Sequence, residues 1–307
     1  LKPASAPPCC STTSRVRFDS FEAACTLHYA DSFNNDHQIS NCHFVNNTVH
    51  RNSTSANRAA GLALVFHGRA RGNSISLSGS SFTRCVSEYA TGGVAVVYLD
   101  VAQNNMITMS STSFVANQGA LASAMLIVFN GTAATVNSVS FADLLVHGNL
   151  PPANAQSASA GPAVSIAYGV FCVAGQNSFF ARHCVFSDNH GLRAGSALSI
   201  SAYSYAAGQL VSIADSVFDR NFGQVRAFRT LELMLSRLHC AVQSAALSIT
   251  SGWRLAEPFL AALTNTSFTR NRARCDFCCC QGGALSIVYV FMSAQDAVFV
   301  NNSASHS

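Results

Sequence analysis

Hydrophobic and polar positions recur in one frame along most of this chain, and phenylalanine marks that frame. Eight segments share it, and they align on Phe44, Phe82, Phe114, Phe141, Phe186, Phe218, Phe268 and Phe299. An asparagine follows three residues later in six of them, as Asn47, Asn117, Asn189, Asn221, Asn271 and Asn302. Cys85 and Leu144 hold that position in the other two segments. Recurrence in one frame indicates a repeated structural unit.

The residues that precede each phenylalanine alternate in polarity. Five residues before it the side chain is always apolar, and seven residues before it is apolar in seven of the eight segments. Three residues before it the chain always carries a polar residue or glycine. A period of two predicts a short strand with one buried face. The polar or glycine residue then marks a bend, after which a second strand buries the phenylalanine.

A second motif lies between these segments and predicts a third strand. It reads Ala-(Val/Leu)-Ser-Ile and occurs at residues 163–166, 197–200, 246–249 and 284–287. Three short strands per repeat, separated by unequal lengths of chain, are typical of a solenoid with variable loops. No amphipathic pattern with a helical period persists. We therefore predict an all-β protein, a right-handed parallel β-helix of about eight coils, whose hand follows the general crossover preference.

The repeat also divides the chain. It covers residues 37–307, for which we predict a single β-helix, and a long insertion is expected near residues 222–245. Residues 1–36 fit the repeat poorly and are interpreted as an N-terminal extension or an irregular cap.

The two signatures, Gly-Gly-Ala-(Leu/Ile/Val) and Phe-x-x-Asn, resemble those of the polymorphic outer membrane proteins of chlamydiae. Large algal and protist surface proteins carry similar repeats. In this chain the first signature is found at Gly282-Gly283-Ala284-Leu285 and the second at residues 114–117. The resemblance extends over residues 37–307. It implies a β-helix displayed outside the cell, where it would serve in adhesion or as a structural surface element.

Charge is sparse and narrows the classes of function. Only 10% of the residues are charged and the net charge is +4, which excludes a disordered polyelectrolyte and a nucleic-acid binder that works through a basic patch. No charged residue lies between Asp100 and Asp143, but many polar residues interrupt this stretch. We therefore predict no transmembrane segment. No motif in the chain calls for a cofactor.

Twelve cysteines without regular CxxC spacing favour an oxidising compartment, and hence an extracellular or cell-surface location. We expect Cys240 to pair with one member of the cluster Cys275, Cys278, Cys279 and Cys280, because both lie in long loops of adjacent coils. Further candidate pairs are Cys172 with Cys184, and Cys9 or Cys10 with Cys25. A zinc site at the cluster would need a suitably spaced fourth ligand, so we expect no metal.

Five sequons mark candidate sites for N-linked glycans. They begin at Asn46, Asn52, Asn130, Asn265 and Asn301. Asn52 and Asn130 lie in loop-like stretches and are expected to be the best acceptors. Asn46 and Asn301 each follow a repeat phenylalanine by two residues, where the side chain can point outward or into the corner.

Catalysis on polysaccharides is the alternative that many β-helices suggest. Glycoside hydrolysis requires two suitably spaced carboxyl groups. Asp143 and Asp188 share a position two residues after the phenylalanine, and a local cluster forms around residues 188–191 with Asp215 and Asp219. These residue types are also the usual choice for tight corners. We interpret them as corner residues and predict no catalytic site.

The sequence thus predicts a non-catalytic extracellular glycoprotein with a structural or adhesive role. Uncovered solenoid ends present unpaired strand edges, which promote association. We expect self-association, end to end or lateral, as a protomer of a surface fibre or coat. Extracellular polysaccharide is a further candidate partner, and a polysaccharide-active enzyme or carbohydrate-binding module is the alternative function.

Overall fold

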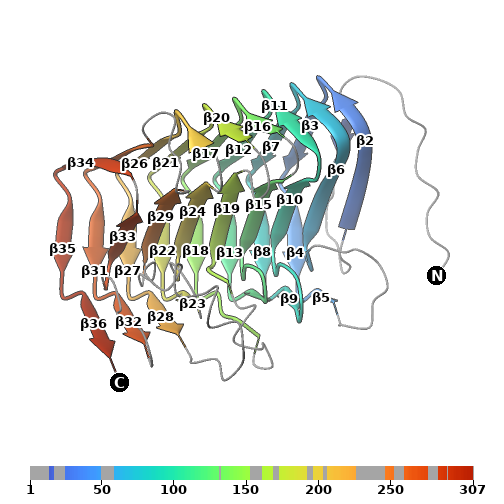
Figure 1. Cartoon of the computed structure of the whole chain (residues 1–307). Coiled ribbons are helices and arrows are strands. Elements are labelled where there is room, and N and C mark those ends of the chain that lie inside the picture. Colours follow the sequence, from blue (N-terminus) through green and yellow to red (C-terminus); the bar gives the residue numbers. More distant parts are fainter. Residues whose placement is uncertain are drawn as a thin grey trace, which may run out of the picture.

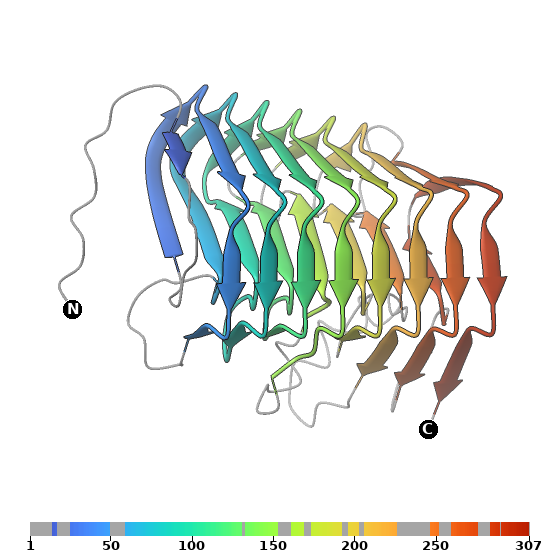
Figure 2. The ribbon, with the colours of Figure 1, turned by 180° about the vertical axis from the view of Figure 1, so that it is seen from behind.

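The computed structural model describes residues 14–16, 25–49, 59–130, 133–152, 161–168, 173–191, 196–202, 206–225, 246–251, 259–275, 283–288 and 290–306. These residues wind into a parallel β-helix, which confirms the predicted fold class (Figure 1). Each strand pairs in parallel with its counterpart in the next coil (Figure 2). Within these ranges no helix is long and apolar enough to cross a membrane.

The first face of the β-helix is a nine-stranded sheet. Alternate residues of its strands are buried, as in Ser74–Ser78, where Ile75 and Leu77 point into the core. Its strands, in order along the axis, are β1 (Ser14–Val16), β3 (Asp36–Ser40), β7 (Ser74–Ser78), β12 (Met106–Ser110), β17 (Ser138–Ala142), β21 (Ser178–Arg182), β26 (Leu210–Ala214), β30 (Leu260–Thr264) and β34 (Phe291–Gln295).

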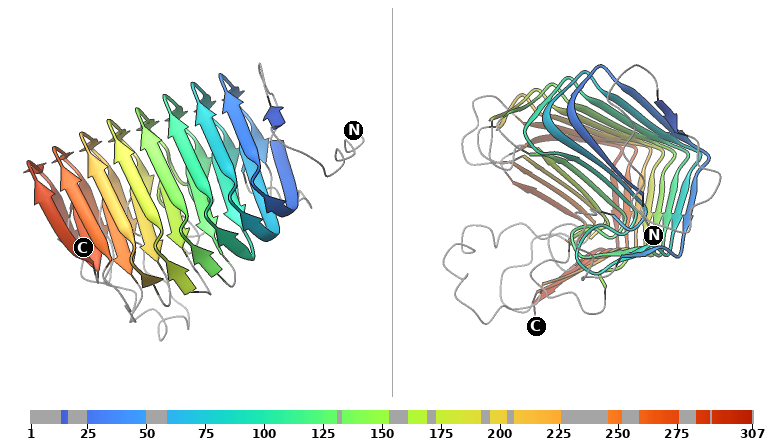
Figure 3. Two further views of the ribbon diagram at one scale, coloured as in Figure 1. Left: turned by 90° about the horizontal axis from the view of Figure 1, so that it is seen from above. Right: turned by 90° about the vertical axis from the view of Figure 1, so that its right-hand side faces the viewer.

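The second face is an eight-stranded sheet of three-residue strands, each with its middle residue pointing inward. We number the coils 1 to 8 by these strands. They are β4 (His43–Val45), β8 (Ser81–Thr83), β13 (Ser113–Val115), β18 (Leu145–His147), β22 (Val185–Ser187), β27 (Val217–Asp219), β31 (Ser267–Thr269) and β35 (Val298–Val300). Figure 3 shows how the strands of each face lie over one another along the axis.

The third face has twelve strands and contains the Ala-(Val/Leu)-Ser-Ile motif. One row consists of β2 (Cys25–Phe33), β6 (Leu62–Arg71), β10 (Val94–Tyr98), β15 (Met125–Phe129), β19 (Val164–Tyr168), β24 (Leu198–Ala202), β29 (Leu247–Ser251) and β33 (Leu285–Val288). A shorter row continues from the end of β6 through β11 (Val101–Gln103), β16 (Ala133–Thr135), β20 (Val173–Gly175) and β25 (Ala206–Ala207).

Two small sheets follow the second face and lead toward the third. The first contains β5 (Thr48–Val49), β9 (Val86–Ser87) and β14 (Gln118–Gly119). The second contains β23 (His190–Gly191), β28 (Phe222–Val225), β32 (Arg272–Cys275) and β36 (Ser303–His306).

The repeat phenylalanines form an internal column on the second face. Neighbouring rings stack nearly parallel, with centroids between 4.7 and 5.0 Å apart. Stacked aromatic pairs contribute about 0.5–1.5 kcal/mol each beyond their burial. The column consists of Phe44, Phe82, Phe114, Val146, Phe186, Phe218, Phe268 and Phe299.

The predicted frame of coil 4 is wrong, because Phe141 does not belong to this column. It lies on the first face in register with Met109 and Ala181, and Val146 takes its place between Phe114 and Phe186. Each frame fits one half of the motif: the frame of Phe141 supplies the phenylalanine but has Leu144 at the asparagine position, whereas the frame of Val146 supplies Asn149 but no phenylalanine. The matching asparagine is accordingly Asn149, whereas Leu144 lies in the core before the strand.

Buried asparagines three residues after the column residues form what we call the principal ladder. Each amide nitrogen donates to a backbone carbonyl of the preceding coil at 2.8–3.0 Å, and each except the last also donates to the side-chain oxygen of the next asparagine at 2.9–3.0 Å. The ladder runs through Asn117, Asn149, Asn189, Asn221, Asn271 and Asn302. Each asparagine thus forms the hydrogen bonds that its own buried amide needs. A buried amide without a partner would lower the stability of the fold by about 1–3 kcal/mol.

A second asparagine ladder and a second aromatic column, neither predicted from the sequence, also run along the axis. Asn73, Asn105, Asn137 and Asn177 link successive coils at the corner before the first face, at 3.0 Å each. Each stands nine residues before a residue of the phenylalanine column, so extending the alignment would have revealed them. On the third face the rings of Tyr29, Phe66, Tyr98, Phe129 and Tyr168 stack in a row.

Both predicted segment boundaries need correction. The β-helix does not begin at residue 37, because Cys25–Phe33 forms β2 and pairs with β6. The expected insertion at 222–245 starts later, because Phe222–Val225 forms β28 and pairs with β32. Residues 226–245 lie outside the described residues.

Cys85 interrupts the principal ladder, and this makes the ladder testable. Its thiol, whose pKa burial raises to about 11, donates to the carbonyl oxygen of Phe44 at 3.4 Å. Its backbone N–H donates to the side-chain oxygen of Asn117. Within the described residues, the buried side-chain amide of Asn47 in coil 1 has no hydrogen-bond partner.

We expect Cys85→Asn to raise the free energy of unfolding by about 1 kcal/mol, because the new side-chain oxygen accepts a hydrogen bond from the Asn47 amide. Urea unfolding followed by circular dichroism measures the change. Cys85→Ala is the control, since it removes the thiol without supplying an acceptor and should lower stability. An Asn variant no more stable than the parent would contradict the proposed role of the ladder.

Candidate functional site

Two rows of corners border the second face, and both force side chains outward. Every residue in these rows has a left-handed backbone, with φ between 44° and 62°, and none of its side chains is buried. The row before the strands consists of Asn41, Gly79, Ser111, Asp143, His183, Asp215, Asn265 and Asp296. The row after them consists of Asn46, Arg84, Ala116, Gly148, Asp188, Arg220, Arg270 and Asn301.

Charged and histidine side chains gather on these rows in coils 4 to 7. We call this surface the charged ledge, and it consists of Asp143, His147, Arg182, His183, Asp188, Asp215, Asp219, Arg220 and Arg270. Its members come from adjacent coils, because residues at equivalent corners stack about 4.8 Å apart along the axis. Ion pairs connect these residues across coils 4 to 7, so the ledge is the candidate functional site.

One part of the ledge lies along the first row of corners. His183 lies between two carboxylates, with Nδ1 3.5 Å from Asp143 and Nε2 3.6 Å from Asp215. Arg182 approaches Asp215 at 3.2 Å, and the side chain of Asn265 donates to the same carboxylate at 2.9 Å. These hydrogen bonds, that from Asn265 first, lower the pKa of Asp215 below its ordinary value.

The other part of the ledge pairs each arginine with the carboxylate of the preceding coil. Arg220 donates through Nε and Nη2 to both oxygens of Asp188, at 2.7 and 2.8 Å. Arg270 holds Asp219 in the same way, at 3.0 and 2.7 Å. Such two-point pairs fix the guanidinium planes. The hydrogen bonds from Arg220 also lower the pKa of Asp188.

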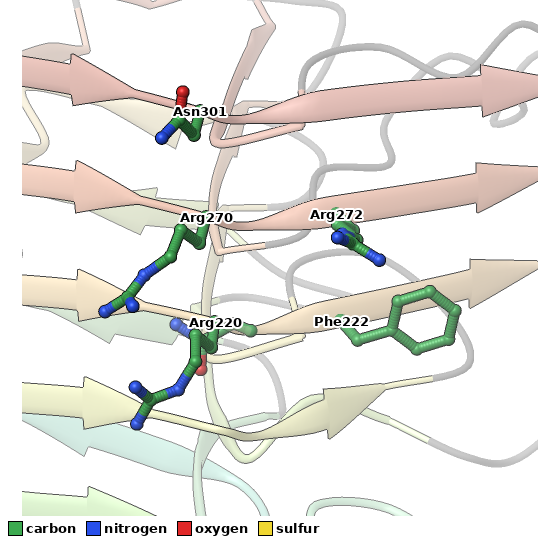
Figure 4. Close-up of a pocket in the computed structure, with 6 residues that line it drawn as sticks. Arg220, Phe222, Arg270, Arg272 and Asn301 are labelled. Atoms are coloured by element: carbon green, nitrogen blue, oxygen red, sulfur yellow. The ribbon is translucent and has the colours of Figure 1, made fainter.

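A shallow hollow of about 490 Å³ lies beside these arginines (Figure 4). Arg220 and Arg270 extend in the same direction from successive coils, while Phe222 and Arg272 lie on the strands that follow them. Asn301 borders the hollow from coil 8. Arg272 is exposed and makes no ion pair with any described residue.

The ledge contains serine, histidine and aspartate together, but not in the geometry of a nucleophilic triad. Nδ1 of His147 lies 3.0 Å from the hydroxyl of Ser187 and 3.4 Å from a carboxylate oxygen of Asp188. A triad needs the carboxylate on one ring nitrogen and the serine on the other, so that the base is oriented while it accepts the proton. Here both partners approach the same nitrogen. This cluster therefore does not support nucleophilic catalysis.

The carboxylates do not form a glycosidase pair either. Asp143 and Asp215 lie two coils apart, and the ring of His183 fills the space between them. Asp188 and Asp219 are each held by an arginine. A general acid for glycoside hydrolysis needs a raised pKa, whereas the pKa of Asp188 and of Asp215 is lowered.

The sequence prediction placed some of these acids wrongly. Asp143 and Asp188 do not share a frame: Asp143 lies in the row before the second face and Asp188 in the row after it. The error follows from the misplaced Phe141. Within the predicted local cluster, Asn189 is a buried member of the principal ladder, and His190 lies on β23 with its ring beside that of Phe222.

Two of the described cysteines that were expected in disulfides, Cys25 and Cys184, carry free thiols, which contradicts the pairs Cys172–Cys184 and Cys9 or Cys10 with Cys25. Cys184 points into the core, and burial raises the pKa of its thiol to about 11. Cys275 lies on β32. The other cysteines named for pairing, Cys9, Cys10, Cys172, Cys240, Cys278, Cys279 and Cys280, lie outside the described residues.

Three of the five sequons begin at exposed corners. Asn46, Asn265 and Asn301 have left-handed backbones and side chains that reach solvent. Asn130 is half-buried at the end of β15, and Asn52 lies outside the described residues. The choice left open for Asn46 and Asn301 is thus decided in favour of the outward direction, because the inward position belongs to the asparagines that follow them.

In the described part of the chain, no three histidine, cysteine, aspartate or glutamate side chains gather as a metal site would require.

Comparisons with known proteins identify no family for this chain. No protein-family model matches the chain, and no curated protein does.

A solved catalytic domain of a GH87 alpha-1,3-glucanase in complex with tetrasaccharides aligns with 95% of the chain, at 7% identity and a TM-score of 0.17. The chain spans 63% of the length of that structure. A TM-score of 0.17 is too low to support an inference about the function of this chain.

The pair between Asp188 and Arg220 predicts a pH-dependent stability. The pKa of Asp188 is lower in the folded protein than in the unfolded chain. The pair therefore contributes its full stability at pH values above the pKa of the unfolded chain, and this contribution is lost as the pH falls through the pKa of the folded protein. Asp188→Asn should lower the free energy of unfolding at pH 7 by less than about 1 kcal/mol, since the pair is partly exposed. Denaturant unfolding at several pH values measures the loss.

At the lowest pH at which both proteins stay folded, the difference between Asp188→Asn and the parent should disappear. Asp296→Asn is the matched control, because Asp296 is also a corner residue but has no arginine partner among the described residues. An equal loss at every pH would show that the ion pair does not cause it.

The exposed sequons predict glycan positions. After secretion from a eukaryotic host, we expect Asn46, Asn265 and Asn301 to carry N-linked glycans. Enzymatic deglycosylation in heavy-oxygen water followed by peptide mass spectrometry would mark each occupied asparagine. Asn47 and Asn302 in the neighbouring ladder positions serve as internal controls and should remain unmarked. Absence of label at all three corners would contradict the prediction.

Proposed function

We propose that this chain is a non-catalytic extracellular glycoprotein, a β-helical structural or adhesive element, and that copies of the 307-residue chain associate through coil 8. The observation that carries the association is the apolar strand edge that coil 8 presents in this chain. Three features of the chain support an extracellular location: the resemblance to repeat-containing surface proteins, the outward sequons and the twelve cysteines. The geometry of the charged ledge supports a role without catalysis.

Coil 8 presents apolar side chains and unpaired strand edges together. Phe291 is 67% exposed, and Phe299 is 48% exposed although its ring stacks on Phe268. β34, β35 and β36 each pair with a strand on one side only. Further exposed apolar residues of this coil are Met292, Val298 and Val300. Such an edge binds another strand readily, because backbone donors and acceptors remain open.

Coil 1, at the opposite end, exposes less apolar surface than coil 8. This difference favours a pair of copies that meet through coil 8 over a head-to-tail fibre. Phe44 is 0% exposed and Ile39 is 2% exposed, although both belong to coil 1, and β1 covers β3 at this end. A head-to-tail contact would have to displace this cover. Two copies that meet through coil 8 bury the same surface on both partners around a twofold axis. We therefore propose a pair rather than a continuous fibre.

Light scattering after size-exclusion chromatography, over a range of concentrations, tests the association. We expect the mass to approach that of two chains as concentration rises. Phe299→Arg should keep the protein monomeric, because it places a charge on the apolar end. Phe180→Arg is the matched control, since Phe180 is exposed to 38% on β21 in the middle of the first face. This variant should associate as the parent does.

Circular dichroism confirms that both arginine variants keep their strands. A monomeric parent at high concentration would overturn the proposed pair. Growth beyond two copies, seen as filaments in electron micrographs, would show that coil 1 opens and that the contact is head to tail.

A further inference from the structure

We infer that the hollow beside the charged ledge binds an acidic polysaccharide, a chain of sugar residues with carboxylate or sulfate groups. The inference rests on the extracellular location in the proposed function, and it is independent of association through coil 8. Three observations carry it: the arrangement of guanidinium groups, their net charge, and the aromatic ring beside them.

The arginines are held in an arrangement that suits a repeating anion. Arg220 and Arg270 occupy equivalent corners of coils 6 and 7 and extend in the same direction (Figure 4). Their spacing along the axis is therefore about 4.8 Å, which is comparable with the length of one sugar residue in an extended polymer. The carboxylates of Asp188 and Asp219 fix the two guanidinium planes before any ligand arrives. Little side-chain entropy is then lost on binding.

Donors remain free after these pairs have formed. A guanidinium group has five N–H donors, and Arg270 uses only Nε and Nη2 toward Asp219. Arg272 makes no ion pair with a described residue and lines the same hollow. The arginines thus outnumber the two carboxylates, so the hollow attracts anions.

An aromatic ring beside the arginines favours a sugar over a bare anion. Phe222 is half-buried, lines the hollow, and is in register with Arg272 on the neighbouring strand. Its exposed part can pack against the apolar face of a pyranose ring while the guanidinium groups bind the acidic substituent. The hollow is shallow and its lining residues come from coils 6, 7 and 8, which suits a polymer that spans several coils. Neutral polysaccharides would leave the arginines without a counterion.

Binding is measured by isothermal titration calorimetry on Phe299→Arg, so that self-association plays no part. The probes are polygalacturonate for carboxylate, a sulfated galactan for sulfate, a neutral galactan, and polyphosphate. We expect binding to at least one of the two acidic polysaccharides that weakens with added salt, and none to the neutral galactan. Arg272→Gln should weaken it about tenfold, the effect of losing one charge-assisted hydrogen bond.

Arg84→Gln is the matched control. Arg84 occupies the same row of corners in coil 2, is exposed, and has neither arginine nor aspartate at the equivalent corners of coils 1 and 3. This variant should bind as the parent does. Phe222→Ala should weaken binding of the acidic polysaccharide, which separates stacking on the sugar from attraction by charge alone.

Three results would overturn the inference. They are equal losses in the variants of Arg84 and Arg272, polyphosphate binding as tight as that of the acidic polysaccharides, and no binding of either acidic polymer. None of these results affects association through coil 8, which the parent chain reports separately.

Discussion

The parallel stacking of coils in one register is the constraint on which the rest of the structure depends. Backbone hydrogen bonds hold neighbouring coils about 4.8 Å apart, so each side chain meets the residue at the same position one coil away. A phenylalanine therefore stacks on a phenylalanine, as Phe218 does on both Phe186 and Phe268. A buried amide can be satisfied only along the axis, and asparagine is suited to this because it both donates and accepts. The same rule makes Asn47, next to Cys85, the weak point of the ladder.

The same constraint arranges the surface. Corners that repeat in every coil place like positions side by side, so two arginines or two aspartates at successive corners would repel each other unless other charges intervene. In the row of corners after the second face, Arg220 and Arg270 each pair with a carboxylate of the preceding coil, Asp188 and Asp219. A row of pairs results, with fixed guanidinium planes and a surplus of donors beside an aromatic ring. Such a row suits the proposed recognition of an acidic ligand, and the lowered pKa of Asp188 and of Asp215 opposes general acid catalysis.

Stacking also makes the two ends unequal. A coil in the middle has a neighbour on each side, whereas coil 8 has a neighbour on one side only and leaves the ring of Phe299 half exposed. In coil 1 the core-facing side chains of Ile39 and Phe44 are buried and β1 is paired with β3, although β4 and β5 pair on one side only. The apolar side chains are thus more exposed at coil 8 than at coil 1, which favours a contact between two copies of coil 8.

The sequence by itself determined the fold class, the phenylalanine column and most of the principal ladder, because a stacked solenoid repeats its side chains in one frame. It did not determine the frame of coil 4. Phe141 supplies the phenylalanine of the motif and Asn149 supplies its asparagine, each in a different frame, and only the neighbours of Val146 and Asn149 distinguish the two alignments. Part of the charged ledge lies in the repeat frame, because Asp188 and Arg220 each follow a repeat phenylalanine by two residues. The contacts of His183 with Asp143 and Asp215 do not follow from that frame, because Asp143 belongs to the misaligned coil. The orientation of each side chain at its corner also depends on its neighbours in space, so only the tertiary structure decided which groups pair.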